Sequence, residues 1–237
     1  MSMRVYRSRD IRGFNIDQTQ VTSLAKCTNC GRWACYSGEL DKLPTQGFCP
    51  MVEQQEVLAK ARNVYNDPEI RKISQESARV EATGYCEWSR VRETMEFATR
   101  IGVKKIGIAY CIGLKREART FAKILTANGF EITSVCCKSG SIPKEEIGLE
   151  DDEKIRPGTK ESVCNPIGQA MIMNEEGTGL NVILGLCVGH DSLFIKHSDA
   201  LVTCLVAKDR VLAHNPVGAL YTSESYYNKK LYEKKVK

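Results

Sequence analysis

The sequence lacks any run of about 18 to 20 consecutive apolar residues, the length that a membrane-spanning helix requires. The positive charges among its first residues are not followed by an apolar stretch, so we expect no secretory signal peptide. These two absences predict a protein that has no membrane role and remains in the cytoplasm. The cytoplasm is a reducing compartment, and structural disulfides are rare there.

The sequence also lacks the composition of a disordered chain. It is 42% hydrophobic and 27% charged, and its 237 residues suffice for one sizeable α/β domain with a small appendage. The formal net charge is +5, and much of the excess lies in the lysines of the tail: Lys229, Lys230, Lys234, Lys235 and Lys237. A solvated terminus explains such a tail. Nucleic-acid binding would need basic residues gathered on one folded face, so the sequence does not favour it.

Cysteine is abundant. The chain has 11 cysteines, an odd number. In a reducing compartment, so many thiols need an explanation other than structural disulfides. The alternatives are metal ligation, redox chemistry and packing in an apolar core.

Composition divides the chain into a series of stretches. Residues 1–25 are polar and are expected to be a poorly ordered leader. Residues 26–51 are rich in cysteine, glycine and proline, and we call them the knuckle. Residues 52–102 form a helical connector, residues 103–221 form an α/β sheet domain, and residues 222–237 form the basic tail.

Hydrophobic periodicity and turn residues predict the order of helices and strands. The expected helices span residues 52–65, 68–83, 87–100, 115–128, 165–174 and 191–197, with a short one after residue 216. The expected strands span residues 105–111, 130–136, 181–187 and 201–207. This alternation predicts an α/β fold, with a doubly wound, flavodoxin-like parallel sheet of about four strands and helices on both faces.

The most specific motif lies in the knuckle, where four cysteines form a candidate metal site: Cys27, Cys30, Cys35 and Cys49. The short gap between Cys27 and Cys30 allows two thiolates to bind one centre from a single tight turn. Two further cysteines complete a tetrahedral set. The knuckle has few apolar residues, so a bound metal would have to hold it together. For the same reason, four unconnected buried thiols are the weaker explanation.

Four thiolates suit either zinc or an iron–sulfur cluster. The second Cys-x-x-Cys pair that is usual for zinc is missing. Three close cysteines and a distant fourth, Cys49, followed by Pro50, are typical of a [4Fe–4S] cluster. The sequence therefore favours the cluster and leaves zinc open.

A second cysteine site is predicted from a repeated pattern. Residues 106–113 and 182–189 each consist of a buried strand, a cysteine, an aliphatic residue and a glycine. Cys111 and Cys187 then stand at the carboxyl ends of strands and face helix N-termini, which favour thiolates. Ligands of open parallel sheets bind at this edge, where the winding reverses. We therefore expect the two sulfurs to share a redox site, a metal site or a second iron–sulfur cluster.

The other candidates for this second site are Cys136, Cys137, Cys164, His190 and His214. Only one of Cys136 and Cys137 should reach it, because consecutive side chains on a strand point to opposite faces. Cys86 and Cys204 are instead expected to be packing residues, since free cysteine often behaves as a small hydrophobe.

The chain also resembles a known family. Three segments, Cys27-Thr-Asn-Cys30, Ala34-Cys35-Tyr36 and Cys49-Pro50, resemble the amino-terminal metal motif of a family of uncharacterised cysteine-rich metal-binding proteins catalogued as a domain of unknown function. Further segments resemble its carboxyl domain: residues 106–114, 135–138, 164–170, 182–191 and 208–221. The resemblance covers nearly everything from Lys26 to Tyr221. It implies metal binding in the knuckle and no particular activity.

The leading hypothesis is a metalloprotein with redox or sulfur-handling chemistry. Thiolates at the sheet edge would hold a second cluster or act on a small molecule or redox partner. The alternative is a non-catalytic sensor or adaptor, in which zinc folds the knuckle and the sheet binds a small ligand or a partner. Nucleic-acid binding through the knuckle and the basic tail is a third hypothesis with less support.

Overall fold

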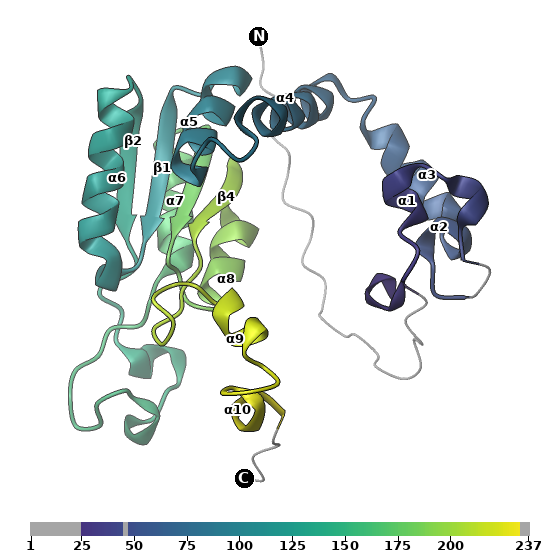
Figure 1. Cartoon of the computed structure of the whole chain (residues 1–237). Helices are drawn as coiled ribbons and strands as arrows, with labels where there is room; N and C mark the ends of the chain where they lie inside the picture. The colour runs from purple at the N-terminus through teal and green to yellow at the C-terminus, as the bar shows by residue number, and fades with distance from the viewer. Residues whose placement is uncertain (1–24, 45–46, 233–237) are drawn as a thin grey trace. The chain divides into compact units, whose positions relative to one another are not determined.

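The structure is a computed structural model that describes residues 25–44 and 47–232. The chain clusters into two compact units, one ending at Arg79 and the other beginning at Val80 (Figure 1). Nearly all of the expected leader and the last lysines of the tail lie outside the described residues. No helix in the described part of the chain is long and apolar enough to cross a lipid bilayer.

The first unit consists of short helices and turns. They are η1 (Cys27–Asn29), α1 (Ala34–Ser37), η2 (Leu40–Lys42), α2 (Pro50–Glu53), α3 (Gln55–Val64) and the start of α4 (Pro68–Gly84). The expected helix over residues 52–65 is divided between α2 and α3, because Gln54 leaves the helical conformation at φ −127°. Ala34 and Cys49 are the only buried residues in the described part of this unit. Little apolar burial therefore stabilises it.

Helix α4 begins where the sequence predicts. The Asp67 side chain accepts hydrogen bonds from the backbone N–H groups of Glu69 (2.9 Å) and Ile70 (3.2 Å). Pro68 occupies the first helical position, where a missing N–H group costs nothing.

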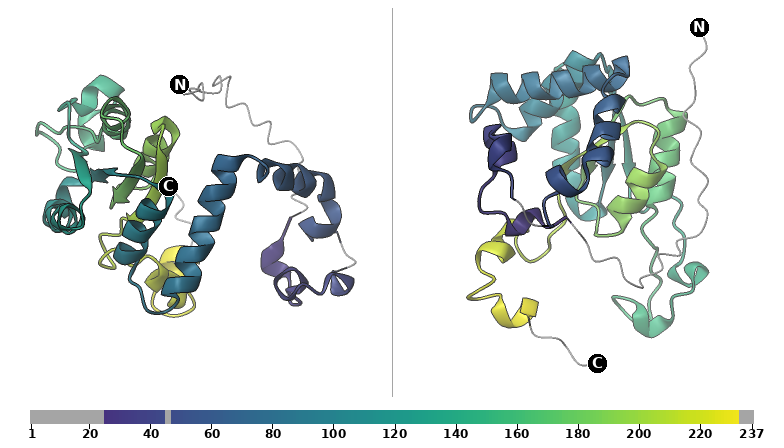
Figure 2. Two further views of the ribbon diagram at one scale, coloured as in Figure 1. Left: turned by 90° about the horizontal axis from the view of Figure 1, so that it is seen from above. Right: turned by 90° about the vertical axis from the view of Figure 1, so that its right-hand side faces the viewer.

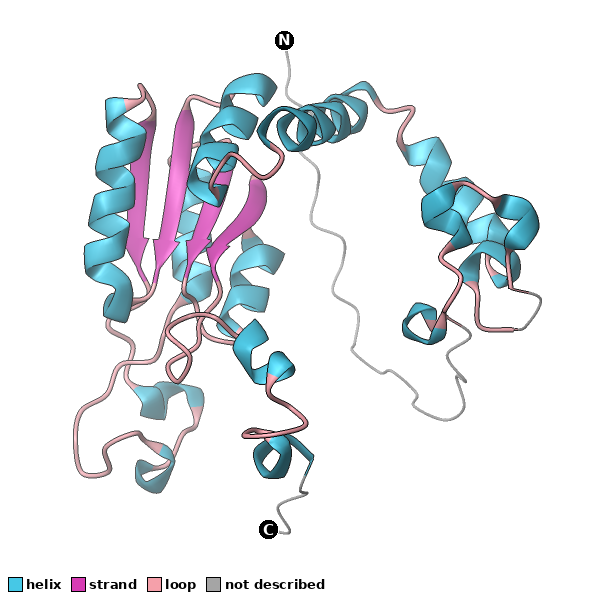
Figure 3. Cartoon of the chain, viewed as in Figure 1, coloured by secondary structure: helices cyan, strands magenta, loops and turns pink. Residues whose placement is uncertain are grey.

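The second unit is built around a sheet of four parallel strands in the order β2-β1-β3-β4 (Figure 3). They are β1 (Lys105–Tyr110), β2 (Glu131–Cys136), β3 (Leu180–Leu184) and β4 (Leu201–Val206). Tyr110 at the end of β1 pairs with Cys136 of β2 and with Leu184 of β3, so three strands end at the same level. The chain moves from β1 outward to β2 and then returns past β1 to β3. This reversal of winding confirms the predicted doubly wound, flavodoxin-like sheet.

Helices cover both faces of the sheet (Figure 2). Helices α5 (Arg90–Ile101) and α6 (Lys115–Ala127) pack on one face, and α7 (Pro166–Glu175) and α8 (His190–His197) on the other. The first core joins side chains of α5 and α6 to the strands: Met95, Ala98, Ile106, Ile108, Phe121, Leu125, Leu180, Val182 and Leu184. The second core joins α7 and α8 to the strands: Ala109, Val135, Ala170, Met173, Ile183 and Phe194.

Strand β3 is shorter than predicted. It ends at Leu184, and Gly185 takes a positive φ of +72°, which turns the chain before Cys187. Helix α5 begins at Arg90 because the Ser89 hydroxyl accepts a hydrogen bond from the Arg92 N–H at 3.4 Å.

The predicted burial of Cys86 and Cys204 is wrong, since both side chains are exposed. Cys86 lies just after α4 with a positive φ of +59°, in a turn rather than in a core. Cys204 belongs to β4, an edge strand, and strands at a sheet edge are covered less than central ones.

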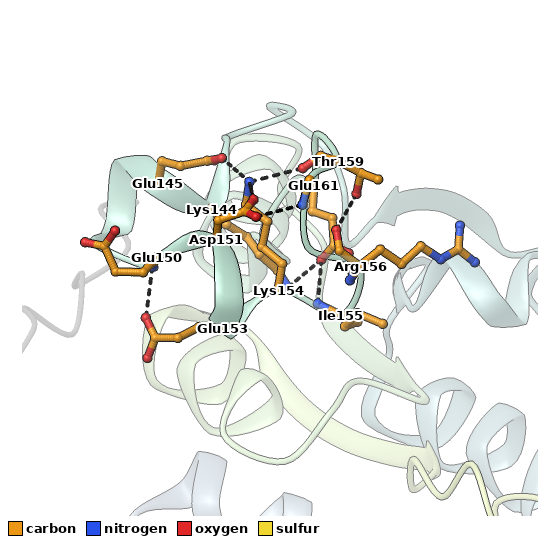
Figure 4. A network of polar contacts seen from close by, with 11 residues as sticks. Lys144, Glu145, Glu150, Asp151, Glu153, Lys154, Ile155, Arg156, Thr159 and Glu161 are labelled. Carbon is orange, nitrogen blue, oxygen red and sulfur yellow. Dashed lines mark hydrogen bonds and ion pairs between the residues drawn. The ribbon is translucent and has the colours of Figure 1, made fainter.

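The polar segment between β2 and α7 is held together by ion pairs (Figure 4). It contains the short 3-10 turns η4 (Lys144–Ile147) and η5 (Asp151–Glu153). The Lys154 side chain is 5% exposed and lies between the carboxylates of Glu145 and Asp151. Lys144 pairs with Glu161 at 2.6 Å. Because these charges are paired within the segment, it forms an ordered excursion that returns the chain to the sheet edge. Beyond β4, the described chain ends with α9 (Val217–Tyr221) and α10 (Asn228–Tyr232).

Candidate thiol site

A pocket lies at the carboxyl edge of the sheet, beyond the ends of β1 and β3. Its lining contains four cysteines, one histidine, one amide and one aliphatic side chain: Cys111, Cys137, Cys164, Cys187, His190, Gln169 and Leu186. The winding of the sheet reverses between β1 and β3, and ligands of doubly wound folds bind at this point. We call these residues the thiol pocket.

Backbone hydrogen bonds bring Cys111 and Cys137 together. The Cys111 N–H donates to the carbonyl of Leu184 (3.2 Å), and the Cys137 N–H donates to the carbonyl of Tyr110 (2.9 Å). Both bonds continue the ladders of the parallel sheet beyond the strand ends. The Ile112 N–H also donates to the Cys137 sulfur at 3.4 Å. Cys111 and Cys137 are therefore fixed as neighbours by the register of β1 and β2.

Cys164 reaches the pocket from the start of α7. The Asn165 N–H donates to the Cys137 carbonyl at 2.7 Å, which joins the two chain segments directly. The Asn165 side chain accepts from the Gly168 N–H (2.8 Å) and donates to the Ser139 carbonyl (3.1 Å). One residue thus caps α7 and anchors the segment that carries Cys164 beside Cys137.

Cys187 lies in the turn between β3 and α8. Its carbonyl accepts hydrogen bonds from the N–H groups of His190 (2.9 Å) and Asp191 (3.1 Å). Its sulfur accepts one from the Arg210 guanidinium at 2.9 Å. Arg210 comes from the loop that follows β4, so a fourth strand contributes to the site.

The thiols differ in their exposure to solvent. Cys137 is 1% exposed and Cys111 is 7% exposed, whereas Cys164 and Cys187 are partly exposed. A reagent that enters the pocket therefore meets Cys164 and Cys187 before the other two. Two polar atoms in this region, Gln169 Oε1 and His190 Nδ1, are buried and have no hydrogen-bond partner in the described structure.

Three of the thiols share hydrogen bonds, and this sets their acidity. The Cys137 thiol hydrogen-bonds to both Cys111 and Cys164 and lowers the pKa of each of those thiols to about 5. Lys208 and the Gly113 N–H contribute to the low pKa at Cys111, and Lys138 and His190 contribute at Cys164. The same two hydrogen bonds, together with burial, raise the pKa of Cys137 above its usual value of 9.0. These contacts therefore favour the thiolate form at Cys111 and Cys164 and the protonated form at Cys137.

The pocket brings together most of the residues predicted for the second site. Cys136 is not among its lining residues, and its thiol contacts the Tyr110 side chain instead. His214 is also outside the lining, and its Nδ1 accepts a hydrogen bond from the Asp209 N–H at 3.2 Å.

Sequence reasoning missed the polar residues around the thiols: Gln169, Lys138, Lys208 and Arg210. Lys138 and Lys208 each follow the end of a parallel strand, which is a signal that could have placed them at this edge. Gln169 gives no such signal. Its Nε2 donates to the carbonyls of Val135 (2.6 Å) and Tyr110 (3.3 Å), and these contacts depend on how α7 packs against the sheet.

The knuckle cysteines lie in or next to the short helical elements of the first unit. A backbone hydrogen bond from the Lys26 N–H to the Phe48 carbonyl (3.0 Å) joins the segments that carry Cys27 and Cys49. Backbone N–H groups of Trp33 and Arg32 hydrogen-bond to the Cys30 sulfur and lower the pKa of that thiol. Cys27 and Cys35 are exposed, Cys30 is partly exposed and Cys49 is buried. Across residues 25–44 and 47–232, no three His, Cys, Asp or Glu side chains are grouped as the ligands of one metal ion.

The fold and the pocket define an α/β protein with a cluster of thiols at the switch point of a parallel sheet. The chain belongs to a family of proteins of unknown function, DUF1847, whose family model matches residues 49–205. That range contains the four pocket cysteines and Cys49. The chain is 46% identical over 210 residues to an uncharacterized protein of Methanocaldococcus jannaschii, and the match covers 89% of this chain and 100% of that protein. No solved structure matches the chain.

Proposed function

We propose that the protein is a metal-binding protein whose thiol pocket carries out two-electron redox or sulfur-handling chemistry. The convergence of Cys111, Cys137, Cys164 and Cys187 on one pocket is the observation that carries this proposal. Thiolates are the nucleophilic form of cysteine, and a neighbouring thiol allows a disulfide to form within the protein. The location at the topological switch point adds support.

The residues suggest distinct roles in the reduction of a disulfide. The Cys164 thiolate, which is partly exposed, attacks one sulfur of the substrate. A bond forms between Cys164 and that sulfur, the substrate S–S bond breaks, and one substrate thiolate leaves.

The buried Cys137 completes the half-reaction. Its sulfur attacks the Cys164 sulfur while its proton passes to the Cys111 thiolate, to which it is already hydrogen-bonded. A Cys137–Cys164 disulfide forms, and the second substrate thiolate leaves. The substrate gains two electrons, and the cysteine pair loses two.

A second iron–sulfur cluster in the pocket is the less supported version of this proposal. Cluster ligands surround several iron and sulfide ions, and no three possible ligands are grouped around one metal position in the described part of the chain.

The knuckle is proposed to bind the metal through Cys27, Cys30, Cys35 and Cys49. Four thiols suit a [4Fe–4S] cluster or zinc, and backbone N–H groups that donate to a sulfur, as at Cys30, stabilise the thiolate that a metal requires. A bound cluster would supply a one-electron centre, and bound zinc would supply only structure. Because the unit buries so little, we propose that the metal draws the four sulfurs together and completes its folding.

The pocket is tested by peptide mapping after treatment with hydroxyethyl disulfide, an uncharged reagent. We expect a Cys137–Cys164 disulfide in the wild-type protein and a stable mixed disulfide at Cys164 in the Cys137→Ser variant. The Cys164→Ser variant should not react at Cys137. Cys204→Ser, which removes an exposed thiol outside the pocket, is the matched control and should behave as wild type. Absence of any reaction at Cys164 in the wild-type protein would favour the sensor or adaptor hypothesis.

The knuckle is tested by elemental analysis and absorption spectra of anaerobically purified protein. Absorption at about 400 nm would identify an iron–sulfur cluster, and a colourless protein with stoichiometric zinc would identify a zinc site. Cys30→Ser should lose this metal and make the knuckle sensitive to protease, whereas Cys86→Ser should not. Unchanged metal content in Cys30→Ser would overturn the assignment.

A further inference from the structure

Three cationic side chains surround the thiol pocket, and each lies near a different sulfur. Arg210 donates to the Cys187 sulfur at 2.9 Å. Lys208 Nζ and Cys111 Sγ both lie beside Gly113, at 3.5 Å and 3.8 Å from the position that a Cβ atom would take there. Lys138 lowers the pKa of Cys164. The pKa of Arg210 is raised by Cys187 and, at longer range, by Cys111 and Cys164. Arg210 therefore lies within the electrostatic reach of the whole cluster.

No carboxylate offsets these cations from within the pocket, since its lining contains neither aspartate nor glutamate. Two carboxylates lie nearby in the sequence, but each accepts hydrogen bonds from backbone N–H groups next to it in the chain. Asp209 accepts from the N–H groups of Val211 (2.8 Å) and Leu212 (2.7 Å), and Asp191 accepts from its neighbour Ser192 (2.8 Å). Asp209 thereby fixes the turn that presents Lys208 and Arg210.

The balance of charge changes during the proposed reaction. In the resting pocket, three cations face the thiolates of Cys111 and Cys164. When Cys164 forms a mixed disulfide its negative charge is lost, and the cations are left with less compensation. A negative group on the substrate would restore the balance, and it would gain most in a pocket partly shielded from water.

We propose that the substrate of the thiol pocket is a small disulfide that carries negative charge, such as a carboxylate, and that Lys208 and Arg210 bind that charge. The inference rests on the function proposed above. The substrate is small because it must leave room for the buried Cys137 to reach Cys164, in a pocket whose other lining residues include the buried Gln169 and Leu186.

The test compares two alkylating reagents that differ in one charge, iodoacetate and iodoacetamide. Rates are measured by peptide mass spectrometry at Cys164 and, in the same protein, at the exposed Cys204. Both reagents react only with the thiolate, so both rates are proportional to the fraction of Cys164 that is deprotonated. The ratio of the two rates is therefore independent of the pKa of the thiol. We expect the iodoacetate-to-iodoacetamide ratio to be about tenfold higher at Cys164 than at Cys204.

Variants assign the effect to residues. Lys208→Gln and Arg210→Gln should each lower the ratio at Cys164 several-fold. Lys123→Gln, an exposed lysine on α6, is the matched control and should leave it unchanged. Added potassium chloride should lower the ratio in the wild-type protein, since salt screens charges. The salt dependence is measured on the wild-type protein, so it does not depend on whether the variants fold.

The outcomes separate the two proposals. If neither reagent modifies Cys164, the proposed thiol chemistry itself is wrong. If both reagents modify Cys164 with the ratio found at Cys204, the thiol chemistry stands and the anionic substrate is wrong. A high ratio that neither Lys208→Gln nor Arg210→Gln lowers would overturn the roles of these two residues.

Discussion

Cys136 and Cys137 are adjacent in the chain, but their side chains point to opposite faces of the sheet, and only Cys137 lines the thiol pocket. Cys136 is paired with Tyr110 of the neighbouring strand, whereas Cys137, the next residue, belongs to the thiol pocket. The alternation of side chains predicts that only one of them reaches the site, but not which one. That choice depends on the face that α7 covers, because Cys137 belongs to the core beneath α7 and α8. Local sequence carries no direct information about that packing.

Gly107 is expected to be intolerant of a side chain. A Cβ atom at this position would come within 2.1 Å of Asn181 Oδ1 and 2.7 Å of the Met173 sulfur. Asn181 is fully buried and hydrogen-bonds to Thr178 and Ser198, so it cannot move without losing partners. We predict that Gly107→Ala lowers the free energy of unfolding by about 1–3 kcal/mol, measured by urea denaturation. Gly218→Ala, where the nearest atom is 3.5 Å away, is the control. Equal effects of the two changes would contradict the prediction.

Cys164 is expected to react with iodoacetamide well below neutral pH. The Cys137 thiol hydrogen-bonds to it and lowers its pKa to about 5, so it remains a thiolate until the pH falls through that value. We predict that its alkylation rate is nearly constant from pH 8 to pH 6 and then declines. In the Cys137→Ala variant the decline should begin at higher pH. A wild-type rate that rises tenfold per pH unit across this range would show an ordinary thiol.

At the scale of elements, the local sequence predicts the starts of helices better than any other boundary. Asp67-Pro68 and Asn165-Pro166 predict the starts of α4 and α7, because a cap residue and a following proline act through the nearest backbone groups. The division of α2 from α3 at Gln54 was not predictable in this way, since no glycine or proline marks it. Strand β3 was predicted too long because an apolar run continues past its end at Gly185.

Asn165→Ala should destabilise both α7 and the pocket. The change removes the cap to Gly168 and the hydrogen bond to Ser139, so we predict a loss of about 1–2 kcal/mol in the free energy of unfolding. It should also broaden the conformations of Cys164 and alter its alkylation rate. Ser89→Ala removes a longer cap bond of 3.4 Å at α5 and should cost less, with no effect on Cys164. Equal losses in the free energy of unfolding for the two variants would show that the hydrogen bond from Asn165 to Ser139 adds nothing beyond the helix cap.

At the scale of the whole molecule, the fold class was predictable and the complete site was not. Alternating strands and helices indicate a parallel sheet, and the repeated motif around Cys111 and Cys187 indicates its functional edge. The contributions of Lys208 and Arg210 depend on the position of β4 beside β3, which is a property of the sheet order. The sequence shows which cysteines and cationic residues follow each strand. Only the order of the strands in the sheet shows which of these side chains lie close together.

The acidity of the thiols also predicts how stability depends on pH. Cys111 and Cys164 have a pKa of about 5 in the folded protein, against an ordinary value of 9.0. Between these values the unfolded chain binds more protons than the folded one, so the free energy of unfolding rises with pH across this window. This contribution is fully present only above pH 9 and is lost as the pH falls through about 5. Cys137, whose pKa is raised, keeps its proton in the folded protein, so it contributes a slope of opposite sign, which sets in only as the pH approaches the ordinary value of 9.0.

The measurement is urea denaturation under reducing conditions from pH 6 to pH 8.5. We expect the wild-type free energy of unfolding to increase with pH. The increase should be smaller in a Cys111→Ser, Cys164→Ser double variant, because a hydroxyl group does not titrate in this range. Cys204→Ser retains both thiolates and should follow the wild-type slope. Parallel slopes for the wild type and the double variant would mean that the two thiols are protonated in the folded state, and the nucleophile assigned to the pocket would then be lost.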